Sequence, residues 1–353
     1  MLRLGTSPED LERAAEIIRG GGIAAFPTET VYGLGASAFN PRALARVFEI
    51  KNRPRFDPLI LHIADPAFLD RIACLSVLDP RRRRIQESLA AAFWPGPLTL
   101  ILPKRPEVPG LLTAGLSTVA VRLPDHPAAQ ALIALSGGAV AAPSANPFGC
   151  LSPTRAGHVI EGLGDRIDCL VDGGPCSVGL ESTVLDLSSP LPRILRPGGI
   201  SREALETKAG TAVEGDTDPE KTEIVPGAVP SPGMLKSHYA PETPLFLHGP
   251  EEMAALPRRV REGYLFFSGK SRTAWEKKNP PAKAAGGQGG GMYGGAEILV
   301  LSEDGAIREA AAELFDHLHR LDRAGLYRIH AETFPGEGLG VAANDRLRRA
   351  AAK

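Results

Sequence analysis

The chain has 353 residues, of which 43% are apolar and 23% are charged, and its formal net charge is -1 at pH 7. A chain of this length is longer than a typical domain with a single hydrophobic core, which predicts two domains. The near-zero charge gives no support for a protein that binds nucleic acid or a membrane through its overall field. The four cysteines include no CxxC pair, so their spacing fits neither a zinc site nor a disulfide framework and predicts free thiols.

The N-terminal pattern is typical of an amphipathic helix over 8–19. Ser7 is a good N-cap, Pro8 and two acids fill the first turn, and Gly20–Gly22 ends the helix. This pattern differs from that of a signal peptide. No window of the sequence reaches the ~20 apolar residues of a membrane-spanning helix. We therefore expect a cytoplasmic protein.

Strand-like apolar runs alternate with helical patterns after this helix, which indicates an α/β domain with a mixed sheet. The expected strands lie at 23–26, 59–63, 98–102, 118–123, 139–143, 169–172 and 182–187. The expected helices lie at 41–50, 79–93 and 127–136. The run of four arginines at 81–84 falls in one of these helices and is interpreted as a solvated face.

Composition then shifts to Gly, Pro, Thr and acids, which is typical of a linker. A second α/β pattern follows, with strands expected at 245–248, 264–268, 297–301 and 326–330, helices at 305–323 and 341–352, and a glycine-rich surface loop at 286–295. The predicted organisation is a catalytic α/β domain at 1–207, a linker at 208–243 and a smaller α/β domain at 244–353.

The stretch FPTETVYGLG (26–35) carries the first polar cluster. Residues 28–32 put hydroxyls and one carboxylate at the carboxyl end of a predicted strand, where open α/β sheets bind ligands. Gly33 and Gly35 predict that a small ligand approaches the backbone closely. Glu29 could orient Mg²⁺ or a basic side chain, and a polar turn with capping threonines is the alternative for the whole stretch.

The stretch KNRPRFDP (51–58) carries the second cluster. Its two prolines hold the chain extended after a helix. Lys51 and Arg53 then suit a triphosphate, because a guanidinium supplies a bidentate fork and an ammonium a movable point charge. A solvated charge run is the alternative.

The stretch AAPSANPFGCLSPT (141–154) carries the third cluster. Ser144, Asn146 and Ser152, together with backbone N–H groups in a turn, could bind phosphate oxygens or a nucleotide. The stretch contains no Walker loop, and no GxSxG elbow surrounds Ser144. A turn with capping hydroxyls is the alternative.

Single polar residues on apolar strands form the fourth group: His62, Ser182, Arg122 and Arg196. A buried arginine is costly unless it meets an anion. Arg122 could therefore hold a carboxylate, and Arg196 a phosphate. A structural salt bridge is the alternative for both arginines, and a core position is the alternative for His62.

These stretches, with WPGPLT, TVAVRLPDHP, ESTV and LRPG, occur in an order that resembles the L-threonylcarbamoyl-AMP synthases and their YrdC-type domain. The resemblance covers about 10–205 and continues through PGMLKSHYAP (232–241) into the GLGVAANDRLRRAA ending, as in the longer, two-domain branch. It implies a twisted mixed-sheet YrdC-type α/β domain followed by a smaller Rossmann-like α/β domain.

The resemblance implies an enzyme that condenses L-threonine, bicarbonate and ATP, with Mg²⁺, to threonylcarbamoyl-AMP and pyrophosphate. The product would feed the threonylcarbamoyl modification of tRNA adenosine, with a possible hand-off to the next enzyme complex. Lys51 and Arg53 match the catalytic cations. Matches to nucleotide contacts are Lys51, Arg53, Thr118, Ser144, Asn146, Ser152, Arg196 and Tyr239. Matches to threonine contacts are Thr30, His62, Arg122 and Ser182. HYAP (238–241) would close as a lid over the nucleotide.

One departure from the family pattern is Asp57, which stands where an asparagine is usual. A carboxylate beside a triphosphate is unfavourable unless Mg²⁺ intervenes or the side chain turns away. Two other readings are an RNA-binding module that uses the basic runs, and a relative that consumes carbamoyl phosphate. The near-zero charge and the lack of RNA-binding motifs count against the first. Missing acylphosphatase and zinc-finger segments count against the second.

Overall fold

The computed structural model describes residues 1–215, 231, 239–280 and 295–352. These residues form two compact units. The first unit comprises Met1–Phe148 and Ser152–Lys236, and the second comprises Gly149–Leu151 and Ser237–Lys353. Most of the predicted linker and nearly all of the predicted loop at 286–295 lie outside the described residues. Within the described ranges, no helix is both long and apolar enough to cross a lipid bilayer.

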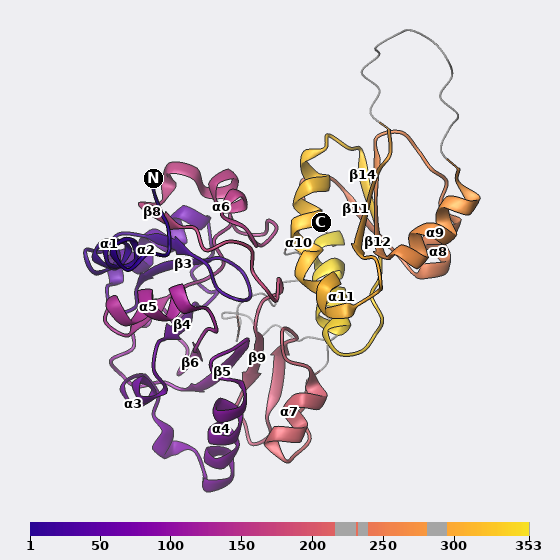
Figure 1. The fold of residues 1–353 in the computed structure, drawn as a ribbon. Helices are drawn as coiled ribbons and strands as arrows, with labels where there is room; N and C mark the ends of the chain where they lie inside the picture. Colours follow the sequence, from indigo (N-terminus) through magenta and orange to yellow (C-terminus); the bar gives the residue numbers. More distant parts are fainter. Residues whose placement is uncertain (216–230, 232–238, 281–294, 353) are drawn as a thin grey trace. The chain divides into compact units, whose positions relative to one another are not determined.

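The first unit is built on one ten-stranded sheet with the order β1-β8-β2-β3-β7-β4-β6-β5-β9-β10 (Figure 1). Its strands are β1 (Leu2–Leu4), β2 (Ala24–Phe26), β3 (Gly33–Ser37), β4 (Ile60–Ile63), β5 (Leu98–Pro103), β6 (Thr118–Arg122), β7 (Ala139–Ala141), β8 (Cys169–Val171), β9 (Thr183–Asp186) and β10 (Arg193–Arg196). Parallel pairs such as β4 with β6 stand beside antiparallel pairs such as β5 with β6. The predicted mixed α/β fold is therefore confirmed.

The helices of the first unit are α1 (Pro8–Arg19), α2 (Pro41–Lys51), α3 (Leu69–Ile72), α4 (Pro80–Phe93), α5 (Pro127–Leu135), α6 (Ala156–Leu163) and α7 (Arg202–Ala209). Four of them, α1, α2, α4 and α5, match the predicted helices. The side chain of Ser7 accepts a hydrogen bond from the backbone N–H of Asp10, as an N-cap should. The sequence analysis did not predict α3, α6 or α7, which are only four to eight residues long and too short to show a clear helical periodicity.

Gly33 and Gly35 lie within β3, which pairs with β2. A Cβ added at Gly35 would lie 2.8 Å from the ring of Phe26 and 3.0 Å from Val140, and one added at Gly33 would lie 3.2 Å from the same ring. The expectation that these glycines admit a ligand is therefore wrong. They make room for the Phe26 ring on the sheet.

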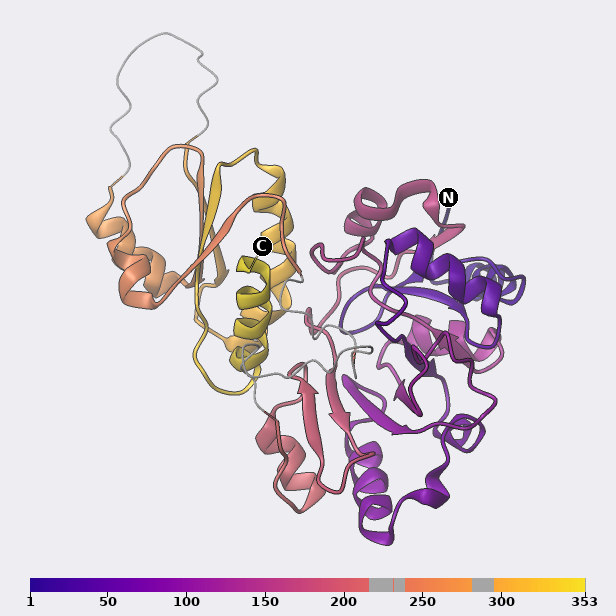
Figure 2. The same cartoon turned by 180° about the vertical axis from the view of Figure 1, so that it is seen from behind.

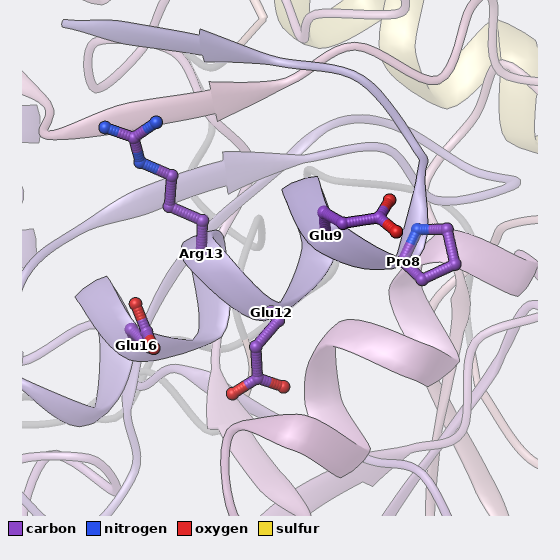
Figure 3. Close-up of a pocket in the computed structure, with 5 residues that line it drawn as sticks. All are labelled: Pro8, Glu9, Glu12, Arg13 and Glu16. Carbon is purple, nitrogen blue, oxygen red and sulfur yellow. The ribbon is translucent and has the colours of Figure 1, made fainter.

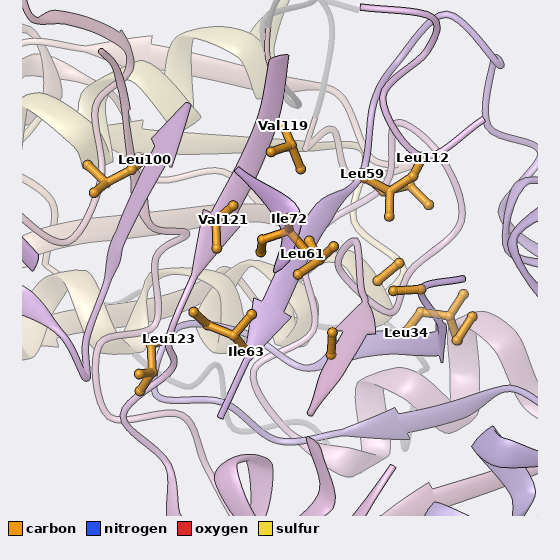
Figure 4. Close-up of a cluster of buried hydrophobic side chains, with 14 of the residues drawn as sticks. Leu34, Leu59, Leu61, Ile63, Ile72, Leu100, Leu112, Val119, Val121 and Leu123 are labelled. Atoms are coloured by element: carbon orange, nitrogen blue, oxygen red, sulfur yellow. The ribbon is translucent and has the colours of Figure 1, made fainter. Parts of the chain in front are cut away.

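The main hydrophobic core of the first unit covers one side of the central strands (Figure 4). Leu61 and Ile63 of β4 and Val121 of β6 point into this core. Because side chains alternate along a strand, the residues between them face the other side. That other side carries a small cluster of Ile60, Ile101, Ala120 and Val184 and a larger one that includes Phe26 and Val140, and His62 lies on the same side.

The second unit is a four-stranded, all-parallel sheet with the order β11-β14-β12-β13. Its strands are β11 (Leu245–His248), β12 (Glu262–Ser268), β13 (Glu297–Ser302) and β14 (Arg328–Glu332). Its helices are α8 (Pro250–Ala255), α9 (Gly269–Lys278), α10 (Ile307–Arg323) and α11 (Leu339–Ala351). Figures 1 and 2 show α8 and α9 on one face of this sheet and α10 and α11 on the other. The alternating pattern predicted an α/β domain here, and its doubly wound arrangement agrees with the Rossmann-like domain that the family resemblance implies.

Candidate functional site

Three neighbouring strands of the first unit bring polar side chains into one row. His62 of β4 lies opposite Arg122 of β6, and Arg122 lies opposite Thr99 of β5. Residues that face each other across neighbouring strands point to the same side of a sheet. Since Leu61 and Val121 point into the main core, this row occupies the opposite side of the sheet.

Arg122 is held by three acceptors. Its Nη1 donates to Thr30 Oγ1 at 2.8 Å, its Nη2 to Glu29 Oε1 at 2.5 Å, and its Nε to the carbonyl of Gly96 at 3.2 Å. Both members of the Arg122–Glu29 ion pair are buried, and Glu29 also accepts from the backbone N–H of Asp125. Glu29 thus orients a basic side chain, which is one of the two roles left open by the sequence. The guanidinium is fixed in one orientation and suited to a bidentate carboxylate.

Ser182 links this row to Arg196. The hydroxyls of Ser182 and Thr99 are 2.7 Å apart, and Arg196 Nη2 donates to the Ser182 hydroxyl at 3.1 Å and to its carbonyl at 3.0 Å. Sequence reasoning missed Thr99. The signal was the same one that selected His62, a single polar residue inside the apolar strand LTLIL.

His62 is almost fully buried, with its Nδ1 3.3 Å from the carbonyl of Ile60. Burial, together with the positive charge of Arg122, lowers the pKa of His62 to about 3. The imidazole is therefore neutral near pH 7. It can exchange hydrogen bonds with a small polar ligand, but it is too weak a base to take a proton from an ammonium group.

Lys51 connects the end of α2 to the turn that contains Ser144 and Asn146. Its ammonium donates to the carbonyl of Ser144 at 2.6 Å and to the carbonyl of Asn146. Ser144 also forms a β-bridge with Gly33 at the start of β3. Three of the predicted nucleotide residues, from two separate sequence motifs, are thus brought together.

Arg53 folds back on its own loop and pairs with Asp57. Its Nε donates to the Asp57 carbonyl at 3.1 Å, its Nη2 donates to the Pro58 carbonyl at 2.8 Å, and the same Nη2 lies 2.8 Å from Asp57 Oδ1. None of these contacts uses Nη1. Burial raises the pKa of Asp57, and the charges of Arg53, Lys51 and Arg196 oppose this shift. Asp57 therefore lies among the basic side chains rather than turned away from them.

The remaining predicted nucleotide residues are more dispersed. Ser152 is buried and donates to Glu181 Oε1 at 2.5 Å. Thr118 begins β6 on the same side of the strand as Arg122, about 13 Å along it. Tyr239 belongs to the second unit, where its ring packs 5.9 Å from that of Phe315. Its contact with a nucleotide stays a prediction.

A depression on the outer surface of α1 is a poor alternative site (Figure 3). Its lining consists of Pro8, Glu9, Glu12, Arg13 and Glu16. Three carboxylates against one guanidinium would repel an anionic substrate. The sheet side that carries Arg122 is the candidate site because buried polar side chains from three neighbouring strands gather there.

Two family models cover the chain. One is described as "Telomere recombination" and matches residues 16–198, and the other is described as "Threonylcarbamoyl-AMP synthase, C-terminal domain" and matches residues 200–352. The chain belongs to the threonylcarbamoyl-AMP synthase family. The family predicted from the ordered motifs is thereby confirmed, and the chain is an enzyme.

Relatives of this family match nearly the whole chain. The threonylcarbamoyl-AMP synthase of Pyrococcus abyssi is 42% identical over 344 residues, which cover 96% of this chain and 92% of that protein. The Bacillus subtilis synthase is 40% identical over 353 residues, which cover 99% and 94%. The crystal structure of P. abyssi Sua5 complexed with L-threonine has a TM-score of 0.81 at 38% identity, covering 99% of this chain and 97% of the other.

Proposed function

We propose that the first unit condenses L-threonine, bicarbonate and ATP to threonylcarbamoyl-AMP and pyrophosphate. The observation that supports this proposal is the row of His62, Arg122 and Thr99, which the Ser182 hydroxyl links to Arg196. One end of this row suits an amino-acid carboxylate. The other end leads to the basic group around Asp57, which consists of Lys51, Arg53 and Arg196. The Pyrococcus relative complexed with L-threonine supports the choice of amino acid.

The reaction needs no covalent nucleophile from the protein. The threonine amine attacks the carbon of bicarbonate, a C–N bond forms, and water leaves to give the carbamate. A carbamate oxygen then attacks the α-phosphorus of ATP, and the bond to the β,γ-pyrophosphate breaks. The enzyme contributes orientation of the reactants, which is worth up to about 7–11 kcal/mol in favourable intramolecular cases, and neutralisation of charge.

Two side chains of the row and two of their hydrogen-bonding neighbours would hold threonine. Arg122 would bind its carboxylate, because its guanidinium is already fixed and charged. His62 would bind the threonine hydroxyl or amine as a neutral partner, and it would not act as the base. Thr30 and Ser182 would add hydroxyl contacts from the two sides of Arg122.

The nucleotide would lie along the basic group and along the turn of Ser144 and Asn146, to which Lys51 donates hydrogen bonds. Arg53 Nη1 and Arg196 would contact phosphate oxygens, and the turn of Ser144 and Asn146 would supply backbone and side-chain donors. The remaining predicted ATP contacts are Thr118, Ser152 and Tyr239, the last within a lid formed by HYAP. Mg²⁺ would accompany ATP and neutralise its phosphates.

The residues present fit this ion. Asp57 supplies a carboxylate within the basic group, and its second oxygen, Oδ2, accepts no hydrogen bond from the described part of the chain. Magnesium is usually bound by one or two carboxylates together with substrate phosphates. Asp57 would therefore be the protein ligand, which gives the departure from the family asparagine a function.

The product would enter threonylcarbamoyl modification of tRNA in the cytoplasm, by hand-off to a downstream transferase complex. The deciding experiment is pyrophosphate release from ATP with and without L-threonine and bicarbonate, with mass detection of the adenylate. Release that requires both co-substrates is expected. Release without threonine dependence would reject the proposal, and salt-dependent tRNA binding without ATP turnover would favour an RNA-binding module.

A further inference from the structure

A cavity of about 380 Å³ lies in the second unit, at the carboxyl ends of β12 and β14. β12 leads into α9 on one face of the sheet, and β14 leads towards α11 on the other face. In open parallel sheets, ligands bind where neighbouring strands lead to opposite faces. None of the residues that line this cavity belongs to the site proposed for threonine and ATP.

One acid and one base line the cavity. Glu332, at the end of β14, is only 2% exposed, and it accepts hydrogen bonds from the backbone N–H of Phe267 at 2.9 Å and from the side chain of Ser271. Lys270 precedes Ser271 in the first turn of α9 and is exposed. The buried carboxylate and the cation thus both line the cavity, together with Ser271.

The other walls of the cavity are mainly apolar. The rings of Phe267 and Phe334 lie 5.1 Å apart, and two prolines and two alanines complete this part of the lining. A ligand made only of charged groups would make no favourable contact with this apolar surface. The lining fits a molecule with a charged end and an apolar part.

The same end of the sheet is poorly suited to a phosphate, although a helix begins there. The backbone N–H of Ser271 donates to Ser268 Oγ at 3.2 Å, and that of Gly269 donates to the Glu303 carbonyl at 3.2 Å. These amides are already used within the fold. Lys270 alone would then face a dianion that Glu332 repels.

We propose that this cavity binds a free α-amino acid with an apolar side chain. Lys270 would pair with its carboxylate, and Glu332 with its ammonium group. Phe267 and Phe334 would contact its side chain. One positive and one negative group match a zwitterion, so that the complex buries no net charge. The second unit is then an amino-acid-binding module, separate from the catalytic residues.

The test uses the full-length chain and isothermal titration calorimetry with L-leucine and L-phenylalanine at millimolar concentration. Saturable binding of at least one of them is expected. Lys270→Met and Glu332→Gln should each weaken it by about tenfold or more, because each removes a charge-assisted contact. Lys277→Met is the matched control, since Lys277 is exposed on the same helix but does not line the cavity.

Two chemical controls separate the parts of the ligand. Leucinamide lacks the carboxylate and 4-methylvaleric acid lacks the amine, so both should bind more weakly than L-leucine. Hydrogen exchange should show slower exchange at the β12–α9 junction when L-leucine is present. The proposal is overturned if neither amino acid binds, if Lys270→Met and Glu332→Gln bind L-leucine as tightly as the parent chain, or if inorganic phosphate binds there instead.

Discussion

Replacing Arg122 with alanine should affect both the stability of the first unit and its use of threonine. The substitution removes three hydrogen bonds and leaves Glu29 buried without its cation. Removal of one partner from a buried ion pair costs about 3–5 kcal/mol. For a domain of this size each kcal/mol lowers Tm by about 2–4 °C, so a fall of about 6–20 °C is expected.

The effect on substrate use should be selective. Loss of even one charge-assisted hydrogen bond to the threonine carboxylate corresponds to an increase in threonine KM of about 10- to 150-fold. The KM for ATP should change little, because Arg122 lies outside the basic group around Asp57. Steady-state pyrophosphate release, with threonine and ATP varied separately, measures both constants at a temperature where the variant remains folded.

A double substitution provides the control for stability. Glu29→Gln combined with Arg122→Met removes both charges and should regain part of the lost Tm, because no buried ion is left unpaired. The reasoning is refuted if the ATP KM rises while the threonine KM is unchanged. It is equally refuted if Arg122→Ala melts at the same temperature as the parent chain.

Three further substitutions test the remaining roles. Lys51→Ala should lower kcat by about 100-fold and raise the ATP KM, whereas an effect on threonine KM alone would contradict its assignment. His62→Gln tests the pKa of about 3. In the unfolded chain this histidine becomes protonated below its ordinary pKa of 6.5, whereas buried His62 stays neutral down to about pH 3. The contribution of His62 to stability is therefore present above pH 6.5 and is lost as the pH falls towards 3. Between about pH 7 and about pH 5, the parent chain should therefore lose about 2 kcal/mol more than the variant, measured by denaturant unfolding. Asp57→Asn should raise the Mg²⁺ concentration for half-maximal turnover by about tenfold, and an unchanged Mg²⁺ requirement would exclude Asp57 as a ligand.

The sequence was informative about the site where a polar residue interrupts an apolar strand. His62, Arg122 and Ser182 could be selected in this way, since a buried polar group needs a partner. Their partners could not be predicted. Arg122 and Glu29 are 93 residues apart: Glu29 lies in the segment between β2 and β3 and Arg122 ends β6, and the sheet order that brings them together does not follow the chain.

The helices and strands could also be predicted where their signals are local. Capping residues and apolar periodicity located α1, α2 and most strands, because these signals are local. The interpretation of Gly33 and Gly35 failed because the reason for both glycines is the ring of Phe26, which packs across the hairpin. A glycine that makes room for a side chain and a glycine that makes room for a ligand look the same in a sequence.

The placement of Gly149–Leu151 in the second unit determines how the protein can be divided. The carbonyl of Gly149 accepts from the backbone N–H of Ala240 at 2.8 Å, and Cys150 forms a β-bridge with the same residue. A fragment that stops before Ala240 would therefore lose backbone partners in the middle of the loop between Asn146 and Ser152. A minimal catalytic fragment should extend at least to Ala240, and domain exchange between relatives should transfer both segments together.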